Sequence, residues 1–309
     1  MDDVELVSVN DDSAARARLM RLATYASVSV ASILIVAKLW AWLVTDSISL
    51  MSTLIDSLLD VAASMINLFA VRHALQPADR EHRFGHGKAE PLAGLAQAAF
   101  IVGSAVFLLI QAVQRVAEPR AISHPELGSM VMVFAVVLTV LLVAFQRHVV
   151  KRTNSVAIKA DSLHYQTDVL INAGVFASLF VVGEWGWTLV DPLLAIGIAA
   201  YIIRAAWTIG RDSVAILMDK ELPDEDRRRI SEIVRAQAGV LGLHDLRTRS
   251  SGNQVFIQMH VEMLDDISLR DAHVIAERVE RCVAEAFQEA EVLVHQDPDG
   301  IDEEVRDFA

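Results

Sequence analysis

The chain has 309 residues, of which 53% are hydrophobic, and a formal net charge of -13. Such a composition is typical of a polytopic membrane protein with a soluble part. After Asp219 there are roughly twice as many acidic as basic residues, which argues against nucleic acid as a partner. The single cysteine, Cys282, excludes an internal disulfide and a cysteine-based zinc module.

Six apolar runs, each long enough to cross a bilayer, follow one another along the chain. With six spans, the basic clusters between the runs all fall on the same side of the membrane. The positive-inside rule makes that side the cytoplasm, so both termini are expected inside. Residues 1–15 are expected to be a disordered acidic tail, and residues 16–212 a six-helix transmembrane domain. The expected spans are residues 22–44, 48–73, 91–113, 127–145, 155–182 and 189–209.

From about residue 220 the pattern changes to the short elements of a soluble domain. Helical and alternating patterns follow in the order αββαβ, which predicts a small open-faced α+β sandwich of the ferredoxin-like kind. This cytoplasmic domain is expected over residues 213–298, and residues 299–309 are expected to be an acidic tail. The expected elements are a helix ending at 238, strands at 241–249 and 255–263, a helix at 268–289 and a strand at 290–295.

Two polar pairs interrupt the second and fifth apolar runs. One pair is Asp56 and Asp60, and the other is His164 and Asp168. An ionisable residue inside a membrane is costly and marks a functional site by default. The members of each pair are four residues apart, so they share one helix face, and the helix rise brings the pairs to similar depths. The sequence therefore predicts a four-ligand site for a divalent cation; the alternative is that these side chains snorkel to the interface.

The ligand types at this membrane site indicate which ion it favours. One imidazole with three carboxylates favours zinc-like ions, whereas an all-oxygen set would favour manganese or magnesium. Without metal, the carboxylates would repel one another and hold protons, so metal and protons would compete for the same ligands. Exchange on alternate sides of the membrane would be an antiport. Asp161 either guides ions at the cytoplasmic entrance or is a solvated helix-end acid, and Lys38 is expected to snorkel.

Histidines form two further candidate metal sites. In the loop after the second span, Asp79, His82 and His86 lie within eight residues; the alternative is an ordinary polar loop. His73 adjoins this loop as either an extra ligand or an interfacial residue. The C-terminal domain has several histidines and an acid at the ends of its elements, which predicts a metal cluster there. Its candidate residues are His244, His260, His273, His295, Gln296 and Asp297.

These residues together resemble the cation diffusion facilitator family. The resemblance rests on the two membrane pairs, LQPADREHRFGHGKAE at 75–90, LHDLR at 243–247 and VHQDP at 294–298. It implies a homodimeric zinc/proton antiporter that exports metal from the cytoplasm across a bacterial inner membrane. It also implies a metallochaperone-like cytoplasmic domain and an interlocking charge pair of Lys88 and Asp219. The implied binuclear cytoplasmic site comprises His244, His260, His295 and Asp297, with His273 and Gln296 as further contacts.

Zn²⁺ is the ion expected both as transported substrate and as structural or regulatory ligand, although iron(II) and cadmium also suit this ligand set. Two other functions compete with transport. An intramembrane metalloenzyme would need an open coordination position and a general base, which the four membrane residues do not leave over. A membrane-anchored metal sensor or scaffold would not require two matched polar pairs at membrane depth.

Overall fold

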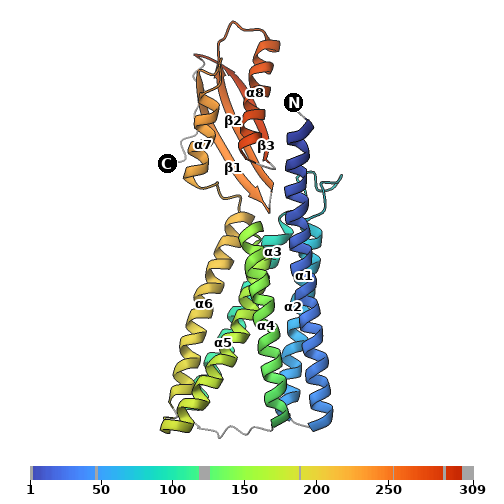
Figure 1. Ribbon diagram of the computed structural model, residues 1–309. Coiled ribbons are helices and arrows are strands. Elements are labelled where there is room, and N and C mark those ends of the chain that lie inside the picture. Colours follow the sequence, from blue (N-terminus) through green and yellow to red (C-terminus); the bar gives the residue numbers. More distant parts are fainter. Residues whose placement is uncertain are drawn as a thin grey trace. The chain divides into compact units, whose positions relative to one another are not determined.

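Six long helices build the first of two units, Met1–Val214, in this computed structural model (Figure 1). They are α1 (Asp3–Thr45), α2 (Ile48–Ala74), α3 (Ala89–Ala117), α4 (Glu126–Thr153), α5 (Val156–Trp185) and α6 (Val190–Leu217). The structure describes residues 3–45, 48–117, 126–187, 189–252, 254–287 and 290–300, but not every side chain within the helices.

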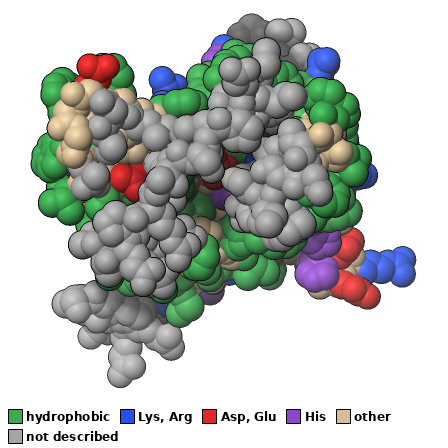
Figure 2. Space-filling view, turned by 90° about the horizontal axis from the view of Figure 1, so that it is seen from below, with side chains coloured by type: hydrophobic (Ala, Val, Ile, Leu, Met, Phe, Trp, Pro, Cys, Tyr) green, Lys and Arg blue, Asp and Glu red, His purple; other side chains and the backbone are tan. Residues whose placement is uncertain are grey.

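The helical unit is apolar on the outside. Large hydrophobic side chains cover the helix surfaces, and they dominate the described part of the face seen in Figure 2. The helix contacts inside are made by small residues, including Ala98 and Ala105 on α3, Ala160 on α5, and Ala199 on α6. Small residues let helix backbones approach closely, and this arrangement is typical of helices packed within a bilayer.

Four of the described segments are long and apolar enough to cross a membrane: Ser13–Val44, Ala89–Ile110, Val133–Thr153 and Val190–Leu217. They belong to α1, α3, α4 and α6. The remaining two helices, α2 and α5, carry the polar residues of the predicted membrane site, and α5 alone contains Lys159, Asp161 and Asp168. Six long helices are therefore present, as expected, and the spanning of α2 and α5 stays a prediction.

The first residues of the chain are helical, and most of the last residues lie outside the part that the structure describes. Helix α1 begins at Asp3, where a disordered tail over residues 1–15 was expected. The segment from Asp3 to Ala15 contains neither glycine nor proline, so nothing in it interrupts a helix that continues into an apolar span. Most of the predicted acidic tail, residues 301–309, lies outside the described residues.

The second unit, Ala215–Ala309, has the predicted αββαβ order. Its elements are α7 (Asp224–Arg235), β1 (Gly242–Ser251), β2 (Gln254–Met263), α8 (Leu269–Ala286) and β3 (Ala290–Pro298). Strand β2 is central; it pairs antiparallel with β1 and parallel with β3, so the sheet is mixed. Ser268 caps α8, because its side chain accepts a hydrogen bond from the N–H of Asp271 at 3.2 Å.

The core of this unit lies on one face of the sheet. Buried residues of α7 and α8, including Ile230 and Val279, pack against Ile257, Met259 and Val261 of β2. Successive strand residues point to opposite faces, so the residues between these three point away from the helices. The open face of the sheet is therefore available for polar side chains.

A buried hydroxyl cluster ties the site-bearing helix α5 to α1 and α2. The Tyr165 hydroxyl lies 2.8 Å from Ser64 Oγ and 3.4 Å from Ser27 Oγ, and the two serine oxygens are 3.0 Å apart. Tyr165 is 1% exposed.

We therefore expect Tyr165→Phe to destabilise the helical unit by about 1–3 kcal/mol, because it leaves buried hydroxyls without a partner. Thermal unfolding in detergent measures this, with Tyr201→Phe, an exposed tyrosine of α6, as the matched control. Equal melting temperatures for the two variants would contradict it.

Candidate metal centres

The structure brings together three of the four predicted membrane ligands. Asp60 comes from the middle of α2, and His164 and Asp168 come from successive turns of α5. His164 Nε2 lies 3.0 Å from Asp60 Oδ1, and one ligand atom from each of the three residues lies within 4.8 Å of the others. His164 is buried and the two carboxylates are half-buried. Two carboxylates and an imidazole converging at this spacing can bind one divalent cation. The side chain of Asp56, the fourth predicted ligand, lies outside the described residues.

Asp161 lies near this cluster, one turn before His164 on α5, and is buried rather than solvated. It is 1% exposed, and each carboxylate oxygen accepts an amide N–H. Gln146 of α4 donates to Oδ2 at 2.6 Å and Gln97 of α3 donates to Oδ1 at 3.3 Å. The side chain therefore joins α5 to α3 and α4, in the same way as Tyr165 joins it to α1 and α2.

The start of α5 is held by a residue that the sequence analysis did not select. Glu90, buried in the first turn of α3, accepts the backbone N–H of Ala157 at 3.4 Å. Ser155 accepts the N–H of Ile158 at 3.2 Å, as a helix cap does. A carboxylate at a helix N-terminus binds N–H groups that have no partner inside the helix. In the sequence, the only signal for this role was an acidic residue between the histidine loop and the third apolar run.

Lys38 of α1 does not extend away from the helices as expected. Its ammonium group donates to Ser57 Oγ on α2 at 2.6 Å, and Ser57 is buried. The contact lies one turn before Asp60 on α2, so the ammonium group is bound within the helical unit.

The loop between α2 and α3 collects the second predicted cluster. Asp79 Oδ1 lies 3.6 Å from His82 Nδ1, and Asp79 Oδ2 lies 3.4 Å from His86 Nε2. The N–H of His82 donates to Asp79 at 2.6 Å and that of Glu81 donates at 2.9 Å. These bonds, the one from His82 above all, favour the charged carboxylate and lower the pKa of Asp79 below its ordinary value. The loop thus presents an ionised oxygen ligand beside two imidazoles.

The third cluster lies on the open face of the C-terminal sheet. His244 of β1, His260 of β2 and His295 of β3 occupy one row across the sheet, because each pairs with the next in the strand register. Asp297, 5% exposed, lies among them. Its carboxylate oxygens lie 2.8 Å from His260 Nδ1, 3.0 Å from His295 Nε2 and 3.3 Å from His244 Nε2. Three imidazoles around one carboxylate suit a zinc-like ion.

Two acids near this row were not selected from the sequence. Glu262 Oε1 lies 3.6 Å from His244 Nε2, and Asp245 Oδ2 lies 3.8 Å from His260 Nε2. Glu262 follows His260 by two residues, so strand alternation alone could have placed both on one face. Asp245 could not be found in this way, because the pairing of β1 shifts between His244 and Arg247.

The structure does not join the remaining predicted contacts to this cluster within the described chain. His273 lies on α8 and pairs with Glu277 at 3.3 Å. Gln296 lies between His295 and Asp297 on β3, so alternation directs it to the opposite face of the strand. Lys88 and Asp219 belong to different units, and their pairing stays a prediction; within its own unit, Asp219 lies 3.6 Å from Arg249.

Two family models together match most of this chain. A family model described as the cation efflux transmembrane domain matches residues 24–218. A second model, described as the cation efflux protein cytoplasmic domain, matches residues 222–299. The chain belongs to the cation efflux family. The family resemblance inferred from the motifs is thereby confirmed, and so is the predicted pairing of a helical transmembrane domain with a cytoplasmic α+β domain.

Individual relatives cover nearly the whole chain. Cation-efflux pump FieF of Yersinia enterocolitica is 48% identical over 285 residues, which are 92% of this chain and 95% of that protein. FieF of Yersinia pestis is 48% identical over 282 residues, 91% of this chain and 94% of that protein. A solved structure of CzrB is 31% identical, with a TM-score of 0.25, and covers 26% of this chain and 99% of that one.

Membership of the cation efflux family decides the broad function. The protein is a membrane protein of a metal-cation efflux family and a transporter rather than an enzyme, so the intramembrane hydrolase is set aside. The C-terminal unit is the family's cytoplasmic dimerisation domain.

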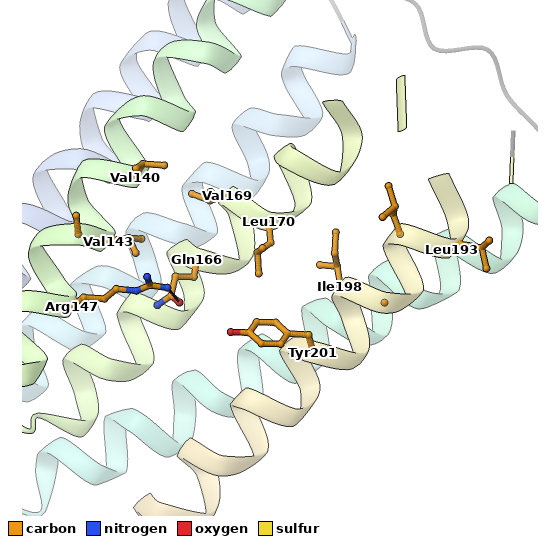
Figure 3. Close-up of a pocket in the computed structure, with 12 residues that line it drawn as sticks. Val140, Val143, Arg147, Gln166, Val169, Leu170, Leu193, Ile198 and Tyr201 are labelled. Carbon is orange, nitrogen blue, oxygen red and sulfur yellow. Dashed lines mark hydrogen bonds between the residues drawn. The ribbon is translucent and has the colours of Figure 1, made fainter. Parts of the chain in front are cut away.

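A cavity of about 600 Å³ between α4, α5 and α6 contains none of the predicted ligands (Figure 3). Its lining is mainly aliphatic, with Val140, Leu170 and Ile198 among the contributing residues. The polar side chains of Arg147 and Gln166 point toward each other at one side, where Arg147 donates to Gln166 at 2.5 Å. This apolar space flanks α5, and the cation-binding geometry of this efflux protein lies elsewhere.

The lowered pKa of Asp79 gives a pH prediction for the loop. A depressed carboxyl pKa contributes stability that is complete above the ordinary value of 3.8 and is lost only as the pH falls through the lower, folded value. Protection of the 79–86 amides from hydrogen exchange, corrected for intrinsic rates, should therefore be equal at about pH 7 and about pH 5 in metal-free protein. Asp79→Ala should lose this protection at both, and Asp265→Ala, in an exposed turn, at neither. Protection that vanished between these two pH values in the unmodified protein would refute the assignment.

Proposed function

We propose that this protein is a proton-coupled antiporter that exports divalent metal cations from the cytoplasm across the bacterial inner membrane by alternating access. The observation that carries the proposal is the convergence of Asp60, His164 and Asp168 from two long helices of a cation efflux protein. We include Asp56, one turn before Asp60, as the fourth ligand. Ionisable groups at such a depth mark a path for ions, because their burial would otherwise only cost stability.

Zinc is the proposed substrate, with iron(II) and cadmium as further candidates. An imidazole in an otherwise carboxylate site favours borderline metals over magnesium or manganese. The 3.0 Å contact between His164 and Asp60 supports the use of both side chains by the same ion. The physiological metal is therefore proposed from ligand chemistry.

Coupling to protons follows from the same ligands. His164 and the neighbouring carboxylates must give up their protons before they can bind a metal ion, so the same side chains serve both ions. Binding of a divalent cation displaces protons from these groups, and return of protons displaces the cation. If the metal ion is released outside and the protons are released into the cytoplasm, each cycle exchanges one for the other.

The loop and cytoplasmic clusters are proposed to hold resident zinc that regulates the pump. Their donor sets fit: Asp79, His82 and His86 in the loop, and His244, His260, His295 and Asp297 on the sheet. We propose that His273 and Gln296 add contacts in the homodimer. Both termini are assigned to the cytoplasm, in agreement with the positive-inside rule and with a cytoplasmic C-terminal domain.

Loss of one membrane ligand tests transport. In proteoliposomes with an imposed pH gradient, Asp168→Ala should lower zinc flux by about 100-fold or more, since even outer partners of metal ligands cost 10–100-fold. Asp265→Ala, which removes an exposed carboxylate, should transport normally.

Collapsing the pH gradient should also stop flux through the unmodified protein. Transport that ignored the gradient would remove antiport, and wild-type flux in Asp168→Ala would remove the site. Absence of flux in the unmodified protein would favour a metal sensor or scaffold.

Replacing the imidazole tests ion choice. His164→Asp should broaden selectivity toward harder ions, because it converts the site to oxygen ligands only. The measurement is the ratio of zinc to manganese flux under identical gradients, with His148→Asp, at an exposed position of α4, as the control. An unchanged ratio in His164→Asp would show that the imidazole does not select the metal.

A further inference from the structure

His73 ends α2, outside the three-residue loop cluster, and its ring meets that cluster. The centres of the His73 and His86 rings are 4.5 Å apart, with planes at 63°. The centres of the His86 and His82 rings are 4.6 Å apart. Three imidazoles therefore follow one another, with Asp79 beside two of them.

These spacings fit ligands of one ion. Zinc–nitrogen bonds of about 2.0–2.1 Å in a tetrahedron place the centres of two imidazole rings roughly 5 Å apart. The two separations around His86, 4.5 and 4.6 Å, lie close to this value. Ring packing without a metal ion would bring the rings together equally well.

The burial and hydrogen bonding of His86 favour a metal ligand over ring packing alone. Its side chain is 4% exposed, and its Nδ1 atom has no hydrogen-bond partner among the described residues. Buried polar atoms without partners are rare and mark the place of a bound water, an ion or a functional group. The His86 ring contacts two other imidazoles, which are themselves ligand groups.

We infer that His73 is a fourth ligand of the loop site, completing a closed tetrahedral set with Asp79, His82 and His86. The inference rests on the proposed binding of metal by this loop. Structural zinc sites are closed by four protein ligands, whereas sites with three keep a position open for water or substrate. The loop site is therefore a resident site, and it is distinct from a position through which the exported ion passes.

The location of His73 gives this coordination a structural consequence. His73 lies in the last turn of α2, the helix that carries Asp60, and His86 lies three residues before α3 begins. A shared ion would fasten the end of α2 to the start of α3. Because Glu90 in the first turn of α3 binds the N-terminus of α5, the same fastening reaches both helices of the membrane site.

Cobalt absorption of the full chain in detergent tests the inference. The reference protein carries Asp168→Ala and Asp297→Ala, so that the loop remains as the cobalt site under study. We expect one cobalt ion per chain with the intense visible absorption of four-coordinate cobalt. His73→Phe keeps a ring against His86 but removes the ligand nitrogen; it should weaken this absorption and lower zinc affinity by about 10–100-fold. His73→Cys, which supplies another ligand, should retain four-coordinate absorption with a new sulfur-to-cobalt band.

The control and the outcomes separate the two levels of the proposal. His148→Phe should match the reference protein in absorption and affinity. If His73→Phe also matches it, His73 only packs against His86 and the inference fails, while the three-ligand loop site stands. If the reference protein binds no cobalt, the proposed loop site itself fails. Size-exclusion profiles identify any variant that has not folded, and His73→Cys then decides through its sulfur band.

Discussion

Asp60 and His164 meet across two helices in a part of the molecule where neither side chain can rely on bulk water. A carboxylate or an imidazole alone inside a transmembrane domain is costly, and each is tolerated because the other lies 3.0 Å away. The contact requires that α5 present one particular face to α2, since a rotation by one residue would turn His164 away. Much of the polar structure inside the helical unit serves this requirement.

Helix α5 is fixed by hydrogen bonds to every one of the first four helices. Tyr165 reaches serines of α1 and α2, Asp161 reaches glutamines of α3 and α4, and Glu90 of α3 binds the helix start. Asp161 and Tyr165 are four residues apart, as are His164 and Asp168, so two adjacent stripes of one helix divide the work between holding and binding. Apolar contacts alone would resist such a rotation weakly in lipid, where burial supplies little force between helices.

The sequence predicted the αββαβ order of the C-terminal unit and most of the residues that meet in three clusters, because both depend on spacing along single elements. Pairs four residues apart define a helix face, and residues of one parity along each strand define one face of a sheet. The partners of Asp161 and Tyr165 were beyond reach, since Gln97, Gln146 and Ser27 are ordinary residues on other helices. Their meaning depends on how the helices pack, and spacing does not encode that. The start of α1 was missed for a similar reason, because polar composition was taken for disorder in a segment without a helix breaker.

The two kinds of cluster differ in how their ligands are joined, and this difference bears on what each can do. On the sheet, His244, His260 and His295 are held in one row by backbone pairing, so the ligands cannot separate without breaking the sheet. In the transmembrane domain, Asp60 and His164 belong to two helices joined by side-chain contacts alone, and a small shear between α2 and α5 would part them. A site that must release its ion needs ligands on elements that can move apart, whereas a site with a resident ion needs ligands that stay together. Any ion that binds the more rigid clusters can alter transport only through its different affinity for the states of α2 and α5, and transport then alters that affinity in return.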